Sequence, residues 1–130
     1  MVETVVHLWE RAGVTRPWND PHEDFVRALR GSTSSVLGAF DGDELIGTAM
    51  VGADGHRGWV YYVAVSPSHQ RRGVGRLLMQ SVEQWLKERQ VPKIQLMVRD
   101  SNAVAVGFYE RLGYRDAKTV VLGRWLHEVQ

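Results

Sequence analysis

The chain has 130 residues, of which 44% are hydrophobic and 24% charged, and this composition is ordinary for one globular domain, residues 1–130. The formal net charge of +1 gives no reason to expect nucleic acid or a membrane surface as a partner. The absence of cysteine excludes a disulfide framework and a cysteine-based metal site or nucleophile. With no signal peptide and no apolar run of membrane-spanning length, these features predict a cytoplasmic protein.

The N-terminal third predicts two helices. Apolar residues in 4–12 recur at three- and four-residue spacing, which is typical of an amphipathic helix. The sequence Asp20-Pro21-His22-Glu23 then predicts a helix start, with Asp20 as the N-cap, Pro21 as the first helical residue and Glu23 as the reciprocal capping-box partner. This second helix is expected to run to about Arg30.

The middle of the chain predicts three strands. Residues 35–40 and 45–51 flank Asp41-Gly42-Asp43, which is a hairpin signal. After a turn at 54–58, the stretch 59–65 is rich in β-branched and aromatic residues and predicts a buried strand.

A glycine-containing turn follows this buried strand. Pro67 ends the strand, and helical spacing of apolar residues predicts a helix over 74–89. Between them, Gln-Arg-Arg-Gly-Val-Gly-Arg at 70–76 places three arginines beside the unpaired N–H groups of a helix start, which favours phosphate binding. A plain surface turn with solvated arginines is the alternative. The sequence fits neither a P-loop nor the three-glycine dinucleotide turn.

The last part of the chain predicts a strand, a helix and two further strands. Residues 93–98 complete a βαβ unit, so this strand is expected to lie parallel to 59–65. Asn102 is the expected cap of a helix over 103–112. The two final strands are expected at 114–117 and 119–125.

Two stretches carry a family resemblance. The pattern Q-x-x-G-x-G at 70–75 resembles the phosphate-binding motif of the GNAT superfamily of N-acetyltransferases. Residues 99–114 resemble the family's N-x-x-A-x-x-x-Y-E-x-x-G-[FY] segment, and the two motifs come in the right order. The resemblance covers roughly 5–125. Within the superfamily, residues 16–21 and 54–59 look like a small bacterial subfamily of the YpeA type.

The resemblance implies an α/β fold with a mixed, mostly antiparallel sheet and helices on both faces. Two parallel strands in the middle of such a sheet splay at their C-terminal ends and admit the pantetheine arm of CoA. The family usually has an edge strand before the first helix, and that strand is expected to be missing here. Its absence would expose the strand at 35–40 and favour a homodimer.

The resemblance also implies an acetyl-CoA-dependent N-acetyltransferase that moves the acetyl group directly to a primary amine, with no metal. Its strand backbone at Val63, Ala64 and Val65 would hold pantetheine and the thioester carbonyl. The pyrophosphate loop would consist of Gln70, Arg71, Arg72, Gly73, Val74, Gly75 and Arg76. Asn102 matches a CoA contact, and Tyr109 matches the general acid that protonates the leaving thiolate. Alternatively, Phe108 and Tyr109 are two core aromatics of their helix.

The general base and the acceptor are left open. Met97 stands where the family's ribosomal-protein alanine N-acetyltransferases have a glutamate, which argues against an N-terminal-peptide acceptor. The substitute bases are His56, Asp54 and Tyr61. The candidate acceptor contacts are Arg16, Trp18 and Asn19, with Trp18 as a core plug as the alternative. A cationic acceptor would want acidic side chains, and Asp20, Glu23 and Asp54 are available.

Two other functions compete with the enzyme. The first is a non-catalytic acyl-CoA-binding module, which the methionine at position 97 and the missing strand favour. The second is a regulatory protein that pairs through its exposed sheet edge. Turnover of acetyl-CoA with a panel of amines separates the first alternative from the enzyme, and the size of the purified chain tests the second.

Overall fold

The computed structural model describes residues 1–127, and the chain divides into two compact units. The first unit is Met1–Met97 and the second begins at Val98. The first unit contains the whole sheet, three α-helices and a short 3-10 helix, η1 (Pro67–His69), and the second contains one α-helix and the C-terminal segment.

A four-stranded mixed sheet forms the centre of the first unit. Its strands are β1 (Ser34–Asp41), β2 (Glu44–Ala53), β3 (Gly58–Val65) and β4 (Ile94–Leu96), in the spatial order β1-β2-β3-β4. The first three strands are antiparallel neighbours, and β4 pairs in parallel with β3. The predicted mixed α/β sheet with mostly antiparallel pairing is therefore confirmed, as is the hairpin between β1 and β2.

Two details of the predicted sheet are wrong. Residues 114–117 and 119–125 form no strand among the residues that the structure describes, and most of their side chains are exposed. As a result β4 is an edge strand, and the parallel pair is not in the middle of the sheet. The physical reason is that β-branched residues such as Val120 and Val121 favour a strand only where a pleated surface half-buries them, and both side chains are exposed.

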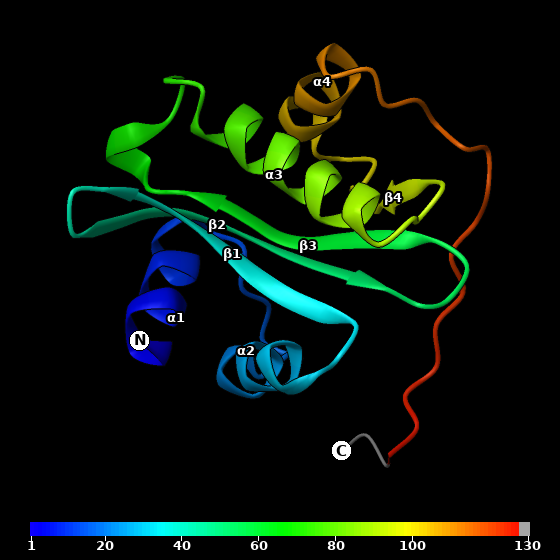
Figure 1. Cartoon of the computed structure of the whole chain (residues 1–130), viewed down its shortest axis with the longest axis horizontal. Helices are drawn as coiled ribbons and strands as arrows, with labels where there is room; N and C mark the ends of the chain where they lie inside the picture. The colour runs from blue at the N-terminus through cyan, green and yellow to red at the C-terminus, as the bar shows by residue number, and fades with distance from the viewer. Residues whose placement is uncertain (128–130) are drawn as a thin grey trace. The chain divides into compact units, whose positions relative to one another are not determined.

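Helices cover both faces of this sheet. Helices α1 (Val2–Arg11) and α2 (Pro21–Arg30) lie on one face, and α3 (Val74–Glu88) lies on the other (Figure 1). None of the helices within residues 1–127 is both long enough and apolar enough to cross a lipid bilayer.

The start of α2 follows the sequence prediction at Asp20 and Pro21, but among the described residues the side chain of Glu23 does not make the expected capping-box bond to the Asp20 N–H. The carboxylate of Asp20 accepts hydrogen bonds from the backbone N–H groups of His22 (3.0 Å) and Glu23 (3.2 Å). Pro21 occupies the first turn, where its missing N–H costs nothing. The side chain of Glu23 lies 3.9 Å from the guanidinium of Arg27, so it serves an ion pair along the helix.

The core of the first unit has a cluster on each side of the sheet. On the face covered by α1 and α2, the buried apolar residues are Val5, Val6, Leu8, Trp9, Phe25, Leu45 and Ala64. On the α3 side, the helix buries Val74, Leu78, Met79, Val82 and Leu86. A side chain at Gly58 would lie 2.5 Å from Leu86, so this glycine lets α3 approach β3 closely.

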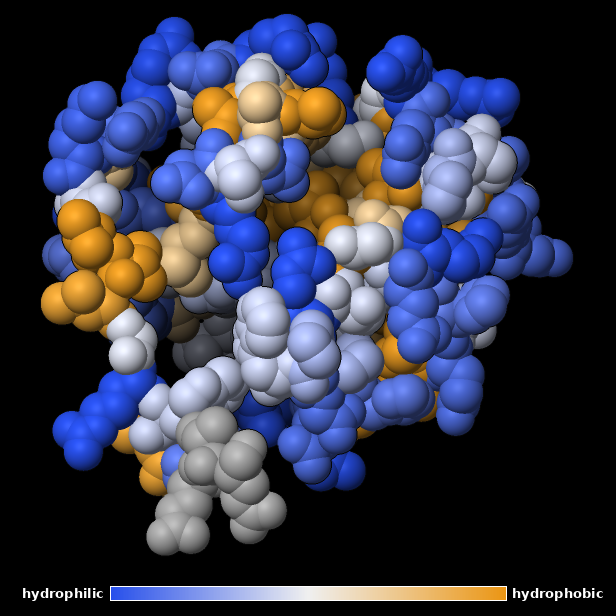
Figure 2. All heavy atoms as spheres, turned by 180° about the vertical axis from the view of Figure 1, so that it is seen from behind, coloured by the Kyte–Doolittle hydropathy of each residue, from blue (hydrophilic) through white to orange (hydrophobic). Residues whose placement is uncertain are grey.

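The second unit contains α4 (Ala103–Arg111) and an extended C-terminal segment. Asn102 caps α4, because its side-chain oxygen accepts from the N–H of Ala105 at 3.1 Å. Large apolar side chains of the C-terminal segment are exposed, with Val120 at 83%, Leu122 at 90% and Leu126 at 96%. The space-filling view of one face of the molecule likewise shows apolar side chains at the surface among hydrophilic ones (Figure 2).

Candidate active site

The turn between β3 and α3 has the geometry of an anion-binding loop. Gly73 is the N-cap of α3 with φ +83°, and Arg71 also has a positive φ, +64°. Among the described residues, no side chain hydrogen-bonds to the first-turn N–H groups of α3. These donors therefore stay available at the positive end of the helix dipole, next to exposed arginines.

The segment before this turn is anchored to the sheet. The N–H of Ser66, which is fully buried, donates to the carbonyl oxygen of Ile46 at 2.7 Å. The amide Nε2 of Gln70 donates to the carbonyl oxygen of Val65 at 3.3 Å. Gln70 is thus a residue that holds the loop against the end of β3, and the loop is positioned before any ligand binds.

The end of β3 lies beside a part of the sheet that β4 does not cover. The pairing of β3 with β4 ends at Val60 opposite Leu96, whereas β3 continues to Val65. Of the three predicted pantetheine contacts, Ala64 is buried, and Val63 and Val65 are half-buried. The uncovered strand edge at 63–65 is therefore followed in the chain by the loop at 70–76, and both belong to the first unit.

Tyr109 and Asn102 both belong to α4, in the second unit. The ring of Tyr109 contacts those of Phe108 and Tyr114 edge to face, at centroid distances of 4.9 and 5.9 Å. Burial raises the pKa of Tyr109 to about 12. Its hydroxyl is therefore a proton donor at neutral pH, as a general acid must be, although the aromatic contacts fit a packing role equally.

The candidate bases differ in their surroundings. The carboxylate of Asp54 accepts from the N–H groups of Arg57 (2.7 Å) and His56 (2.8 Å) and from the indole N–H of Trp59 (3.2 Å). The bonds from Arg57 and His56 are the main causes that lower the pKa of Asp54. The pKa of Tyr61 is raised, mainly by burial and then by the charge of Asp54. Neither group is therefore suited to take a proton at neutral pH.

The loop that carries the candidate acceptor contacts lies between α1 and α2. The side chain of Trp18 is 53% exposed, so the core-plug interpretation is wrong. The guanidinium of Arg16 donates to the carbonyl oxygens of Thr15 (2.7 Å) and Gly13 (3.2 Å), which stiffens the loop. The backbone N–H of Asn19 donates to the carbonyl of Arg16 at 3.1 Å.

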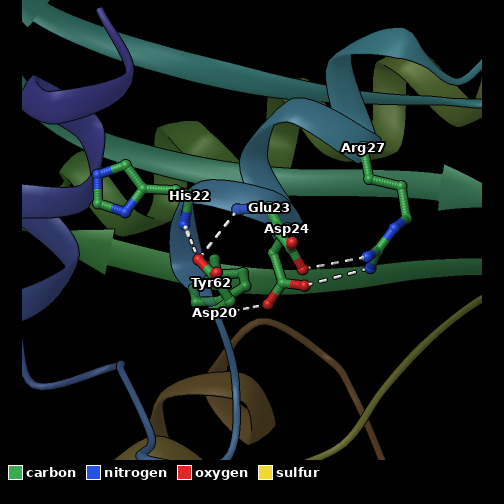
Figure 3. A network of polar contacts seen from close by, with 6 residues as sticks. All are labelled: Asp20, His22, Glu23, Asp24, Arg27 and Tyr62. Carbon is green, nitrogen blue, oxygen red and sulfur yellow. Dashed lines mark hydrogen bonds and ion pairs between the residues drawn. The ribbon is translucent and has the colours of Figure 1, made fainter. Parts of the chain in front are cut away.

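Sequence reasoning missed a group of polar contacts next to the end of β3. The hydroxyl of Tyr62 donates to the carboxylate of Asp24 at 2.6 Å, and Thr48 bridges Trp9 and the carbonyl oxygen of Tyr62. Figure 3 shows the start of α2 bringing Asp24 to Tyr62. No motif signals these residues, because each is an ordinary strand or helix residue until the elements pack together.

The sequence matches the Acetyltransferase (GNAT) family over residues 3–114. Among solved structures, the ribosomal-protein-S18-alanine N-acetyltransferase from Escherichia coli is 27% identical, with a TM-score of 0.78 over 90% of this chain and 73% of that one. An aminoglycoside acetyltransferase from an uncultured soil metagenomic sample, in complex with sisomicin, is 16% identical with a TM-score of 0.81, covering 97% and 88%. AAC(6')-Iy, in complex with a bisubstrate analogue of CoA, is 17% identical with a TM-score of 0.78, covering 95% and 92%.

The chain belongs to the acetyltransferase (GNAT) family, since the match covers most of its length. It is an acetyl-CoA-dependent N-acetyltransferase, with acetyl-CoA as co-substrate and an acceptor as the second substrate. The two structures with lower identity show the fold alone.

Proposed function

We propose that the chain acetylates a small primary amine by direct transfer and binds acetyl-CoA through the end of β3 and the loop at 70–76. The observation that carries this assignment is the uncapped N-terminus of α3, which directly follows the strand that β4 leaves uncovered. The N–H groups of the loop would bind the pyrophosphate, and Arg71, Arg72 and Arg76 would add positive charge. The carbonyl and N–H groups of 63–65 would bind the pantetheine arm.

The reaction needs a nucleophile, a donor for the oxyanion, an acid for the leaving thiolate and an acceptor for the proton of the amine. The neutral amine attacks the thioester carbon, and the negative charge that develops on the carbonyl oxygen is stabilised by the backbone N–H of Val63. When the C–S bond breaks, Tyr109 gives its proton to the CoA thiolate, and the amine loses its extra proton to a base or to solvent. Asn102, as the cap of α4, would contact CoA.

The base is proposed to be His56, acting through water. Its backbone N–H donates to the carboxylate of Asp54 in the turn between β2 and β3, and its imidazole would accept the proton of the amine. Asp54 is a poorer candidate, because its oxygens already accept three hydrogen bonds. An acceptor amine that is neutral at the working pH would need no base.

For the acceptor, we propose a small cationic amine bound near the loop at 16–19. Its half-exposed Trp18 offers an apolar surface, and Asp20 and Glu23 supply negative charge at the start of α2. The Escherichia coli relative is an alanine N-acetyltransferase of a ribosomal protein, but Met97 argues against the same acceptor here. We further assign the chain to the YpeA-type subfamily, without a metal requirement.

A free-thiol assay with acetyl-CoA and a panel of polyamines, amino acids, aminoglycosides and lysine peptides tests this function. We expect release of CoA thiol with at least one small amine, and mass spectrometry should show the matching acetylated product. The binding-module alternative, which Met97 favours, predicts that CoA raises the melting temperature while no amine is acetylated. That pair of results would remove the catalytic assignment and keep the cofactor site.

A further inference from the structure

Tyr62 has a backbone conformation that is rare for its residue type. Its φ is +50°, in the left-handed region that favours glycine. It lies at an irregularity of the β2–β3 ladder, where Thr48 pairs with Ala64 and Met50 pairs with Tyr61. Two residues of β3, Tyr62 and Val63, therefore lie opposite one residue of β2, which is a β-bulge. Such a conformation persists in a tyrosine only where the surroundings impose it.

Three contacts from three elements hold Tyr62 in place. Its ring stacks on that of Trp9 from α1, with a centroid distance of 3.9 Å and an interplanar angle of 11°. Its hydroxyl donates to Asp24 from α2 at 2.6 Å (Figure 3). Its carbonyl oxygen accepts from the hydroxyl of Thr48 on β2 at 3.1 Å.

The Thr48 contact is directional. The indole N–H of Trp9 donates to Oγ1 of Thr48 at 2.7 Å. Because the threonine oxygen accepts that bond, its single proton is directed at the carbonyl oxygen of Tyr62. Thr48 is 1% exposed and Trp9 is fully buried, so water does not compete for the bond between them, and the bond from Thr48 to Tyr62 is partly buried.

The hydrogen bond from Thr48 to the carbonyl of Tyr62 also fixes the direction of the Val63 N–H. The peptide between Tyr62 and Val63 is planar and trans, so its carbonyl and its N–H point in opposite directions. With the carbonyl of Tyr62 held toward the Thr48 hydroxyl, the N–H of Val63 points away from that hydroxyl. At this point of β3 the pairing with β4 has already ended, at Val60 and Leu96, so no carbonyl of β4 (Ile94–Leu96) pairs with this N–H.

We propose that Thr48 is a positioning residue for catalysis, which aims the Val63 N–H at the thioester carbonyl through the relay Trp9–Thr48–Tyr62. The inference rests on the proposed role of Val63 as oxyanion donor. A donor that is already oriented stabilises the charge that develops on the carbonyl oxygen as the amine attacks, without reorganisation. Thr48 touches neither substrate, so its effect should appear on the polarisation of the carbonyl and not on the binding of the rest of CoA.

Infrared spectroscopy of acetyl-CoA labelled with ¹³C at the thioester carbonyl tests this proposal without an acceptor. In the wild type, the bound C=O band should lie at lower frequency than that of free acetyl-CoA. In Thr48→Val, which keeps the shape but lacks the hydroxyl, most of this shift should be lost, while the Kd for CoA without the acetyl group stays close to wild type. Thr48→Ser should restore the shift. With an acceptor that turns over, kcat should fall by up to about 10²–10³-fold, the cost of losing an oxyanion donor.

A matched variant separates positioning from general loss of stability. Val51→Ala truncates another fully buried residue of β2 and should leave the carbonyl shift unchanged. If Thr48→Val does not fold, as judged by circular dichroism, Trp9→Phe serves instead. It keeps a ring but removes the N–H that orients the threonine hydroxyl, and it should reduce the shift.

The outcomes distinguish this inference from the function it rests on. A folded Thr48→Val or Trp9→Phe with the wild-type carbonyl shift overturns the positioning role and leaves the function standing. A wild type that binds acetyl-CoA but shows no shift removes the oxyanion role of this strand, and the inference with it.

Discussion

At the scale of single residues, two tyrosines have different surroundings and different expected roles. Tyr62 donates to a carboxylate and stacks on an indole, so its hydroxyl has a partner that is part of the fold. Tyr109 packs against other aromatic rings, and burial alone raises its pKa. A hydroxyl with a charged partner should matter for stability, whereas the proposed acid should matter for turnover.

Removal of the Tyr109 hydroxyl should therefore lower kcat. Tyr109→Phe keeps the ring and its edge-to-face contacts, so the fold and the Kd for acetyl-CoA should change little. Because general acid groups contribute about 10²–10⁴-fold, kcat should fall by a factor in that range. Steady-state kinetics with the best amine of the panel measures it, with Phe108→Leu as a control for packing. Wild-type turnover in Tyr109→Phe would leave Tyr109 with a packing role only.

Because its pKa is raised, Tyr109 also makes the free energy of unfolding depend on pH. Its folded value of about 12 lies above the unfolded value of about 10, so the folded state holds the phenolic proton more tightly. This contribution to the free energy of unfolding is fully present below pH 10 and is lost as the pH rises through 12. As a general acid, Tyr109 should cause no fall in kcat between pH 7 and 9. A falling limb in that range that disappears in Tyr109→Phe would contradict this.

The Tyr62 hydroxyl should contribute to stability. Tyr62→Phe removes the 2.6 Å bond to Asp24 and leaves the carboxylate partly buried with one partner fewer. We expect the free energy of unfolding to fall by about 1.5–3 kcal/mol, the usual range for a hydrogen bond to a charged group. Urea denaturation measures it. The matched control is Tyr61→Phe at the more exposed neighbour, and an equal loss in both variants would argue against a specific role of Asp24.

At the scale of elements, the turn from β3 to α3 combines two properties. Ser66 and Gln70 fix its first part to the sheet, and the left-handed Gly73 opens α3 with its first N–H groups uncapped. The proposed phosphate site would thus be made mainly of backbone, and the arginines around it are exposed. Variants that block the backbone should cost more affinity than variants that remove one charge.

The expected order of effects on CoA affinity follows from this. Gly73→Asp and Gly75→Asp place a carboxylate where phosphate should approach, and we expect a loss of at least about 100-fold, since a like charge beside the ligand costs several kcal/mol. Arg71→Ala and Arg76→Ala should cost about tenfold or less, because the amides remain. Isothermal titration calorimetry with CoA measures all four.

One control separates charge from backbone strain at the first glycine. Gly73→Asn has nearly the shape of aspartate, tolerates a positive φ and carries no charge. It should bind CoA much better than Gly73→Asp does. Unchanged CoA affinity in both aspartate variants would refute the assignment of the loop.

At the scale of the whole molecule, the sheet has an edge at β1. This strand runs from Ser34 to Asp41 and has a partner, β2, on one side only among the residues that the structure describes. Near its end, the side chain of Phe40 is 53% exposed. An edge of this length is a template for pairing with another chain.

We therefore expect a homodimer that pairs through β1. Sedimentation equilibrium over a range of concentrations should give a mass that rises toward twice 14.7 kDa. Phe40→Glu adds a charge on this edge and should weaken the association without unfolding the chain, with Leu29→Glu, an exposed residue on α2, as the control. A strictly monomeric protein at high concentration would count against the proposal.

The sequence by itself determined the local elements and the loop. Helix starts, the hairpin at Gly42 and the turn at 70–76 depend on neighbouring residues, through caps, positive φ angles and periodic apolar positions, and all were predicted close to their observed bounds. The family motifs likewise lie within short stretches. The catalytic and binding roles assigned to them remain proposals.

Only the tertiary structure decided the rest. The final strands at 114–117 and 119–125 were predicted from local propensity but do not form, because a strand exists only where another strand offers hydrogen bonds. The bulge at Tyr62 and the buried bridge from Trp9 through Thr48 join residues 39 and 14 positions apart. No local pattern encodes such contacts, since they arise when α1 packs on the sheet and a buried indole N–H has to find an acceptor.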